Sequence, residues 1–230
     1  MYHACIQKTG SQWIKSVFND PHIRRKSGLR IHPQFRYEVN QFKSGFPKYT
    51  FVPGLYIPYI LFTEICKPKN YKTIYVLRDP RDVVVSWYYS MKYTHGLMGT
   101  VPYHRKNLKD VGEEEGIEYC IRHLQWKFSF VRSWWQNRGD ETLYICRFED
   151  LIDSKIKEWK KIFSHCEIEI SINEVSSVLE KYTKEKMRKR DKKRRGLDKL
   201  SHYREDPKEW REIFTQRHID IFKSINGNLV

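Results

Sequence analysis

The sequence contains no apolar run long enough to cross a membrane and no segment typical of an export signal. No stretch approaches the roughly 18 consecutive apolar residues that a membrane-spanning helix requires. Residues 1–11 lack the apolar core of a signal peptide. We therefore expect a soluble, cytoplasmic protein without a membrane partner.

Cysteines are few, odd in number and scattered. The five cysteines include no C-x-x-C pair, so the spacing favours neither a disulfide framework nor a zinc site. We expect free thiols in a reducing compartment and no bound metal.

Acidic residues are the minority among the charged side chains. There are 43 Lys and Arg against 28 Asp and Glu, a formal net charge of +15, which favours anionic partners. An anionic cofactor and nucleic acid both fit this charge. No Gly/Ser-rich or Pro-rich linker interrupts the chain, so we expect one domain over residues 1–230.

Short apolar runs alternate with segments of helical periodicity. The predicted strands are residues 2–6, 49–52, 73–77 and 142–146. The predicted helices are residues 12–18, 57–66, 83–93, 113–136 and 151–163. This alternation predicts a three-layer α/β fold with a central parallel sheet flanked by helices, in which ligands bind beyond the carboxyl ends of the strands.

The first predicted strand leads into a basic glycine loop and then a helix. Residues 7–14 read Gln-Lys-Thr-Gly-Ser-Gln-Trp-Ile. Gly10 can adopt backbone angles that are closed to other residues, and the amides at a helix start point toward a common ligand. With the charge of Lys8, the loop is predicted to hold a phosphate-like anion.

A second anion-suited element follows the third predicted strand. Arg78 offers a planar guanidinium that matches two phosphate oxygens, and Ser86, eight residues later, adds a hydroxyl donor two helical turns along.

Together the two elements resemble the sulfotransferase family, which transfers a sulfuryl group from 3′-phosphoadenosine-5′-phosphosulfate (PAPS) and releases 3′,5′-diphosphoadenosine (PAP). The first resembles the family's 5′-phosphosulfate loop and the second its 3′-phosphate element. Residues 144–151 are similar to a third family motif, with Phe148 where the family usually has Tyr. The ordered matches run from residue 7 to about residue 220.

The resemblance implies a role for each matched residue. Lys8 would meet the negative charge that develops on the bridging oxygen. The cofactor-binding residues would be Lys8, Thr9, Gly10, Ser11, Gln12, Trp13, Arg78, Ser86, Phe148 and Arg204, with Trp13 stacking on the adenine.

The catalytic base departs from the family pattern. Where family members that act on hydroxyl acceptors usually carry His, this chain has Tyr56, 22 residues before Arg78. A phenol with a pKa of about 10 is a poor base at neutral pH. Three hypotheses follow: Tyr56 only orients the acceptor, His32 or Glu38 takes the proton, or the acceptor needs little help. We favour His32.

The C-terminal part matches the family less closely. Residues 181–199 hold 11 Lys or Arg against three acids, which predicts a solvated, mobile segment or a lid over 181–204. Around residues 201–210 only Arg204 and Trp210 match a family phosphate-binding loop. Residues 211–220 loosely resemble the family's dimerisation motif, so a homodimer is one hypothesis.

Three other functions share features with this sequence. A P-loop nucleotide triphosphatase needs a Gly-Lys pair, and the chain has none. A basic nucleic-acid-binding protein and a non-catalytic sulfotransferase-like module that binds PAP or PAPS are the alternatives to the enzyme. Aromatic residues within 51–59 and 91–103 favour a small organic acceptor. We expect no nucleic acid partner.

Overall fold

The computed structural model describes residues 1–33, 43–195, 209–227 and 229. The chain divides into two compact units, which are described separately. The first unit consists of residues 1–78 and 129–182, and the second of residues 79–128 and 183–230.

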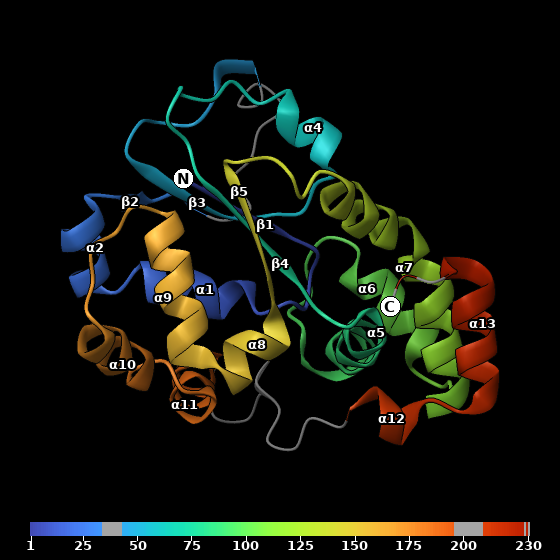
Figure 1. The fold of residues 1–230 in the computed structure, drawn as a ribbon. Helices are drawn as coiled ribbons and strands as arrows, with labels where there is room; N and C mark the ends of the chain where they lie inside the picture. Colours follow the sequence, from blue (N-terminus) through green and yellow to red (C-terminus); the bar gives the residue numbers. More distant parts are fainter. Residues whose placement is uncertain (34–42, 196–208, 228, 230) are drawn as a thin grey trace. The chain divides into compact units, whose positions relative to one another are not determined.

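The first unit is built on a five-stranded sheet in the order β2-β3-β1-β4-β5, with every neighbouring pair parallel (Figure 1). The strands are β1 (Tyr2–Cys5), β2 (Arg30–Ile31), β3 (Thr50–Leu55), β4 (Thr73–Leu77) and β5 (Leu143–Arg147). After β1, the chain adds β2 and β3 on one side of that strand and then β4 and β5 on the other side. The order therefore reverses between β1 and β4, the position where open α/β sheets bind ligands.

Side chains alternate between two buried faces of this sheet. Cys5, Val76 and Cys146 face one core cluster, which also contains Phe18 and Trp159 from helices of the first unit. On the opposite face lie Tyr2, Ala4, Val52, Tyr75 and Leu143, packed with Phe62 and Trp134. Both faces are covered, which explains why the strands read as continuous apolar runs.

The helices of the first unit cover these two faces (Figure 1). They are α1 (Ser11–Phe18), α2 (Pro21–Ser27), α4 (Tyr59–Thr63), α8 (Phe148–Asp153), α9 (Lys155–His165), α10 (Ile172–Glu180) and the last two turns of α7 (Glu113–Gln136). The α/β fold with a parallel central sheet between helical layers is confirmed.

The second unit is helical in its described residues. It holds α5 (Pro80–Tyr89), the π-helical turn η1 (Ser90–Thr94), α6 (Val101–Leu108), the first part of α7, α11 (Lys184–Arg195), α12 (Trp210–Ile213) and α13 (Gln216–Asn226). Contacts between α7 and α13 include Nε2 of His218, 2.9 Å from the carbonyl oxygen of Glu114, and the rings of Phe128 and Phe222, 5.8 Å apart. Gly116 gives room to the ring of Tyr88, since a Cβ there would lie 2.4 Å from it.

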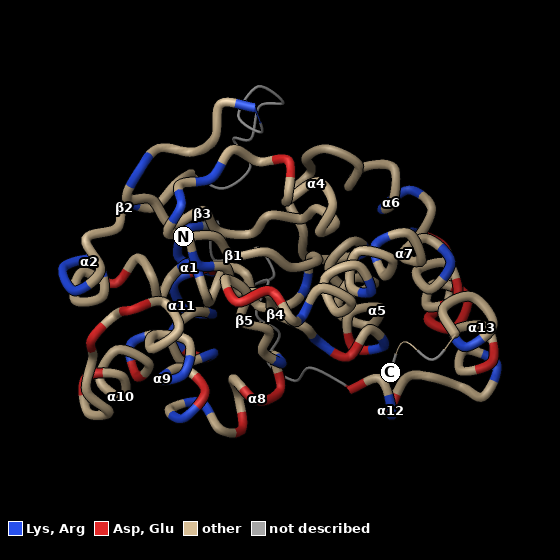
Figure 2. Tube along the Cα trace, turned by 45° about the horizontal axis from the view of Figure 1, so that its top comes forward, with Lys and Arg blue, Asp and Glu red and all other residues tan. Residues whose placement is uncertain are grey.

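The basic segment of residues 181–199 forms helix α11 from Lys184 to Arg195. Lys and Arg follow one another along α11 (Figure 2), while Met187 and Asp191, four residues apart, are its buried positions. Two of the basic residues pair within the helix, Lys189 with Glu185 and Arg194 with Asp191. Residues 196–208, including Arg204, lie outside the described part of the chain.

Candidate functional site

Each strand of the sheet is followed at its carboxyl end by a residue or loop that the sequence singled out. In sheet order these are His32, Tyr56, the loop of residues 6–10, Arg78 and Phe148. Neighbouring strands lie about 5 Å apart, so Tyr56 and Arg78 flank the loop from adjacent strands and His32 starts about 10 Å away. The register of β4 and β5 agrees with this arrangement. Leu77 pairs with Arg147, so the residues that follow them, Arg78 and Phe148, leave the sheet at the same height.

The loop after β1 contains two residues in the left-handed region of backbone space. Lys8 has φ 73° and Gly10 has φ 80°. This conformation is ordinary for Gly10 but costs about 1 to 2 kcal/mol for Lys8, a strain that recurs at functional sites. Helix α1 begins directly after Gly10, with no side chain capping it and no acid in its first turn. Its electropositive end is thus left to an anion.

Thr9 braces the loop from inside. Its side chain is fully buried, and Oγ1 donates a hydrogen bond to the carbonyl oxygen of Ile6 at 2.8 Å. The hydroxyl hydrogen of Thr9 is therefore used within the loop. Gln12 is exposed in the first turn of α1.

Arg78 contacts the loop directly. Its Nη1 donates to the carbonyl oxygen of Lys8 at 2.8 Å, and its guanidinium carbon lies 4.9 Å from the centre of the Phe148 ring. Both contacts hold the cationic head beside the glycine loop.

Phe148 joins three segments of the site. Besides its cation–π contact with Arg78, its ring meets Trp13 edge to face at 6.4 Å and approaches Gly10 so closely that a Cβ there would lie 2.5 Å from it. Trp13 also meets Trp159 edge to face at 5.5 Å, and its buried Nε1 has no hydrogen-bond partner among the described residues. A buried donor thus remains beside the loop.

Tyr56 lies on the other side of the loop. Its hydroxyl and Oγ of Ser11 are 2.9 Å apart. The sequence did not predict this contact. The two residues are 45 positions apart, and the spacing within one motif does not show which residue of the neighbouring strand lies beside it.

His32 is buried rather than at the surface, with 8% of its area exposed. Its Nδ1 lies 2.9 Å from the carbonyl oxygen of Pro33, and because a carbonyl only accepts, Nδ1 is the protonated nitrogen and Nε2 carries the lone pair. Burial lowers the pKa of His32, and the hydrogen bond to Pro33 partly opposes this. The imidazole is therefore neutral near pH 7 and chemically able to accept a proton. Glu38, the other base considered, lies outside the described residues.

Two further predicted residues fall elsewhere in the chain. Ser86 lies on α5 in the second unit, and Arg204 is not among the described residues. In the second unit Trp210 has a structural partner: the guanidinium of Arg81 lies 3.7 Å from its ring centre, and its backbone N–H donates to Asp82 at 2.9 Å.

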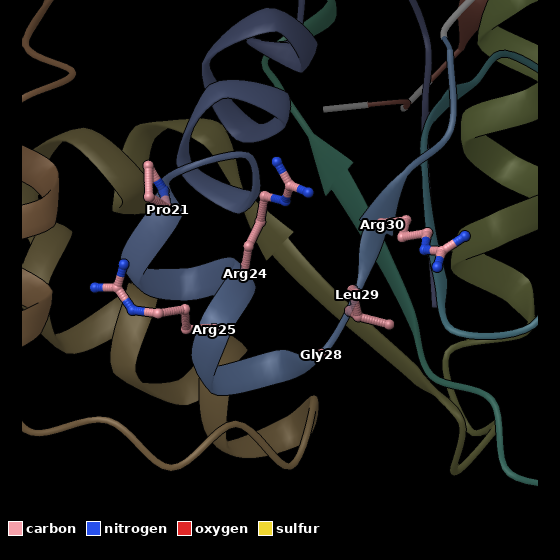
Figure 3. A pocket seen from close by; sticks show the side chains of 6 residues that line it. All are labelled: Pro21, Arg24, Arg25, Gly28, Leu29 and Arg30. Atoms are coloured by element: carbon pink, nitrogen blue, oxygen red, sulfur yellow. The ribbon is translucent and has the colours of Figure 1, made fainter.

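An open pocket of about 420 Å³ lies at α2 and the start of β2, lined by Pro21, Arg24, Arg25, Gly28, Leu29 and Arg30. None of the predicted site residues lines it. Its three arginine side chains point in different directions (Figure 3), so it lacks the convergent donors of an anion site.

Comparison with known proteins identifies the family. A sulfotransferase domain model matches residues 4–230, and the chain belongs to this family, as the sequence predicted. The amine sulfotransferase of Oryctolagus cuniculus is 26% identical over 133 residues, covering 58% of this chain and 42% of that protein. Sulfotransferase 2A6 of Mus musculus is 29% identical over 152 residues, covering 64% and 46%. The matched part thus spans less than half the length of these relatives.

Solved structures share the fold. Mouse sulfotransferase SULT7A1 complexed with PAP superposes with a TM-score of 0.70 at 16% identity, over 99% of this chain and 84% of that chain. Retinol dehydratase in complex with androsterone and the inactive cofactor PAP gives a TM-score of 0.63 at 15% identity, over 99% and 79%. Among the described residues no helix combines the length and apolarity needed to span a membrane.

Proposed function

We propose that this protein transfers the sulfuryl group of PAPS to a hydroxyl or amine of a small organic acceptor and releases PAP. The observation that carries the proposal is the contact between Arg78 and the Lys8 loop at the carboxyl edge of the sheet, where the strand order reverses. Family membership and a PAP-bound neighbour with the same fold support it.

The donor would bind along this edge. The electropositive start of α1 and the loop amides suit the 5′-phosphosulfate, and Arg78 suits a phosphate at the other end of the nucleotide. Trp13 offers an indole near the adenine. The family resemblance adds Ser86 and Arg204 to the 3′-phosphate contacts, and both stay predictions.

Lys8 is proposed as the catalytic cation. As in phosphoryl transfer, bond breaking leaves negative charge on the oxygen that bridges to the leaving group. The ammonium group of Lys8, carried on a strained backbone that fixes the start of its side chain, would stabilise that charge.

His32 is proposed as the group that takes the proton of the acceptor. Its tautomer leaves Nε2 as an acceptor, and burial keeps it neutral at pH 7. The aromatic residues of 51–59 would contribute to the acceptor pocket, and a contribution from 91–103 stays a prediction of the sequence. We also propose a cytoplasmic location and no nucleic acid partner, with a homodimer through residues 211–220 as a further hypothesis.

Two measurements test the function. Thermal unfolding with added PAP should show stabilisation at micromolar concentrations that survives moderate salt, whereas affinity for nucleic acid falls steeply with salt. Transfer of labelled sulfate from PAPS to a panel of phenols, alcohols and amines should then yield a sulfated product without added Mg²⁺. Binding of PAP without transfer to any acceptor would favour the non-catalytic module, and salt-sensitive nucleic acid binding without PAP binding would overturn the proposal.

A further inference from the structure

The hydroxyl of Tyr56 is fixed against the phosphosulfate loop by the sheet itself. Tyr56 directly follows β3, and β3 pairs with β1 so that Leu55 is opposite Ala4. The residues after both strands therefore emerge side by side. This explains how Tyr56 comes to lie 2.9 Å from Oγ of Ser11, the first residue of α1.

The chemistry of the two hydroxyls sets the direction of this hydrogen bond when an anion is present. Ser11 has one hydroxyl hydrogen, and only 7% of the residue is exposed. An anion at the start of α1 would accept that hydrogen, so Ser11 then offers Tyr56 only a lone pair. The phenol, the more acidic of the two hydroxyls, donates to Oγ and turns the hydrogen of Ser11 toward the ligand.

We propose that Tyr56 is a positioning residue of the donor half of the site: its phenol orients the Ser11 hydroxyl toward the 5′-phosphosulfate and takes no proton from the acceptor. This assignment rests on the proposed function. It places Tyr56 beside the donor although its position in the sequence matches that of the family's usual base. Because the phenol stays protonated throughout, Tyr56 contributes to affinity for the nucleotide and leaves the pH dependence to other groups.

The two interpretations of Tyr56 predict different kinetic effects. A positioning hydroxyl is worth one hydrogen bond, so Tyr56→Phe should weaken PAP binding about threefold to tenfold and raise KM for PAPS by a similar factor. A general base contributes about a hundredfold to ten-thousandfold to turnover, so losing it would lower kcat by that amount and leave PAP binding unchanged.

The experiment is a double-mutant cycle on PAP affinity, measured by calorimetry with Tyr56→Phe, Ser11→Ala and the double variant. Because the two side chains act through one contact, the double variant should bind PAP no more weakly than about the weaker of the single variants. Tyr144→Phe is the matched control. It also removes a phenol hydrogen bond of the first unit, the 2.6 Å contact with Glu158, but lies outside the loop and should bind PAP as the wild type does.

The pH profile of kcat/KM supplies the second readout. Tyr56→Phe should keep the shape of the wild-type profile. Additive effects in the cycle, unchanged PAP affinity in Tyr56→Phe, or a hundredfold loss of kcat with an altered profile would each overturn the positioning role. Failure of the wild type to bind PAP at all would instead remove the proposed function on which the inference stands.

Discussion

Nη1 of Arg78 donates a hydrogen bond to the backbone oxygen of Lys8 at 2.8 Å, across 70 residues of sequence. Since the same guanidinium lies over the ring of Phe148, Arg78 links the ends of three strands, β1, β4 and β5. It is therefore both a charge for the nucleotide and a brace for the loop that holds it.

Arg78→Lys should show how much of the effect of Arg78 depends on the shape of its guanidinium and how much on its positive charge. Lysine keeps the positive charge but lacks the planar fork that reaches the Lys8 oxygen while facing an aromatic ring. We expect PAP affinity to fall about tenfold to a hundredfold, the effect of losing a hydrogen bond to a charged group. Calorimetry measures it, and Arg147→Lys, on the exposed neighbour of Phe148, should change little. Unchanged PAP affinity in Arg78→Lys would exclude Arg78 from the nucleotide site.

Lys8→Ala should lower kcat about a hundredfold or more, since removing one charge-stabilising donor costs roughly 3 to 4 kcal/mol in the transition state. Alanine suffers the same left-handed strain as lysine, so the melting temperature should stay close to that of the wild type. Lys8→Gly should be equally slow but more stable by about 1 kcal/mol, because glycine relieves the strain. Lys155→Ala, at the exposed start of α9, is the control. Near-normal turnover in Lys8→Ala would remove Lys8 from the mechanism.

Gly10→Ala is expected to damage both stability and PAP binding. Its Cβ would meet the Phe148 ring at 2.5 Å, and its φ of 80° disfavours any side chain. Gly28→Ala is a matched control, because Gly28 has φ 68° but nothing within 4 Å of its Cβ. The control should lose about 1 kcal/mol of unfolding free energy from the backbone alone.

The difference between the two glycine variants isolates the contact with Phe148. Gly10→Ala should lose about 1 to 3 kcal/mol more than Gly28→Ala, as overpacking of a close contact does. Adding Phe148→Leu to Gly10→Ala should recover part of that difference. Equal losses in Gly10→Ala and Gly28→Ala, measured by denaturant unfolding, would show that the ring moves aside freely.

The sequence predicted the centre of the sheet and the loops that follow it. Strands β1 and β4 are buried on both faces, and the sequence predicted apolar runs at β1, β4 and β5. The ends of these strands, and with them Lys8, Arg78 and Phe148, could therefore be located closely. β2, with two residues, was missed because it is too short for any periodicity. Helix α11 was missed as a helix because nine of its 12 residues are Lys or Arg, which hides the two buried positions.

Contacts between the predicted elements could not be read from the sequence. The Ser11–Tyr56 hydrogen bond and the Phe148 contact with Gly10 depend on strand order, and the order places β3 and β4 on either side of β1. Motif spacing along the chain carries no such information. Nor does the sequence indicate where the chain passes from one unit to the other, and one of these three places, between Arg78 and Asp79, falls within a motif.

The pH dependence of turnover tests His32. Burial lowers its pKa below the ordinary value, so kcat/KM should stay level above neutrality and fall as acid protonates Nε2, with a midpoint below about 6.5. His32→Gln should lower kcat and abolish this acid limb. A wild-type profile with no acid limb down to about pH 4 would exclude a histidine base.

Acid should also destabilise the second unit through His104. This ring is 3% exposed, lies 4.3 Å from the ring of His123, and its Nδ1 is 2.9 Å from the hydroxyl of Tyr119. Burial, then His123 and Lys127, lower the pKa of His104 from 6.5 to about 4.

The folded state therefore binds this proton less readily than the unfolded state. The stabilising contribution is complete above about pH 6.5 and is lost as the pH falls toward 4, on the order of 2 to 3 kcal/mol. Urea unfolding from pH 4 to 8 should show this slope in the wild type and a flatter one in His104→Gln. His95→Gln, at a partly buried loop position outside the contacts of His104, should keep the wild-type slope. Equal slopes in the wild type and His104→Gln would show that His104 titrates alike in both states and is not held neutral by its surroundings.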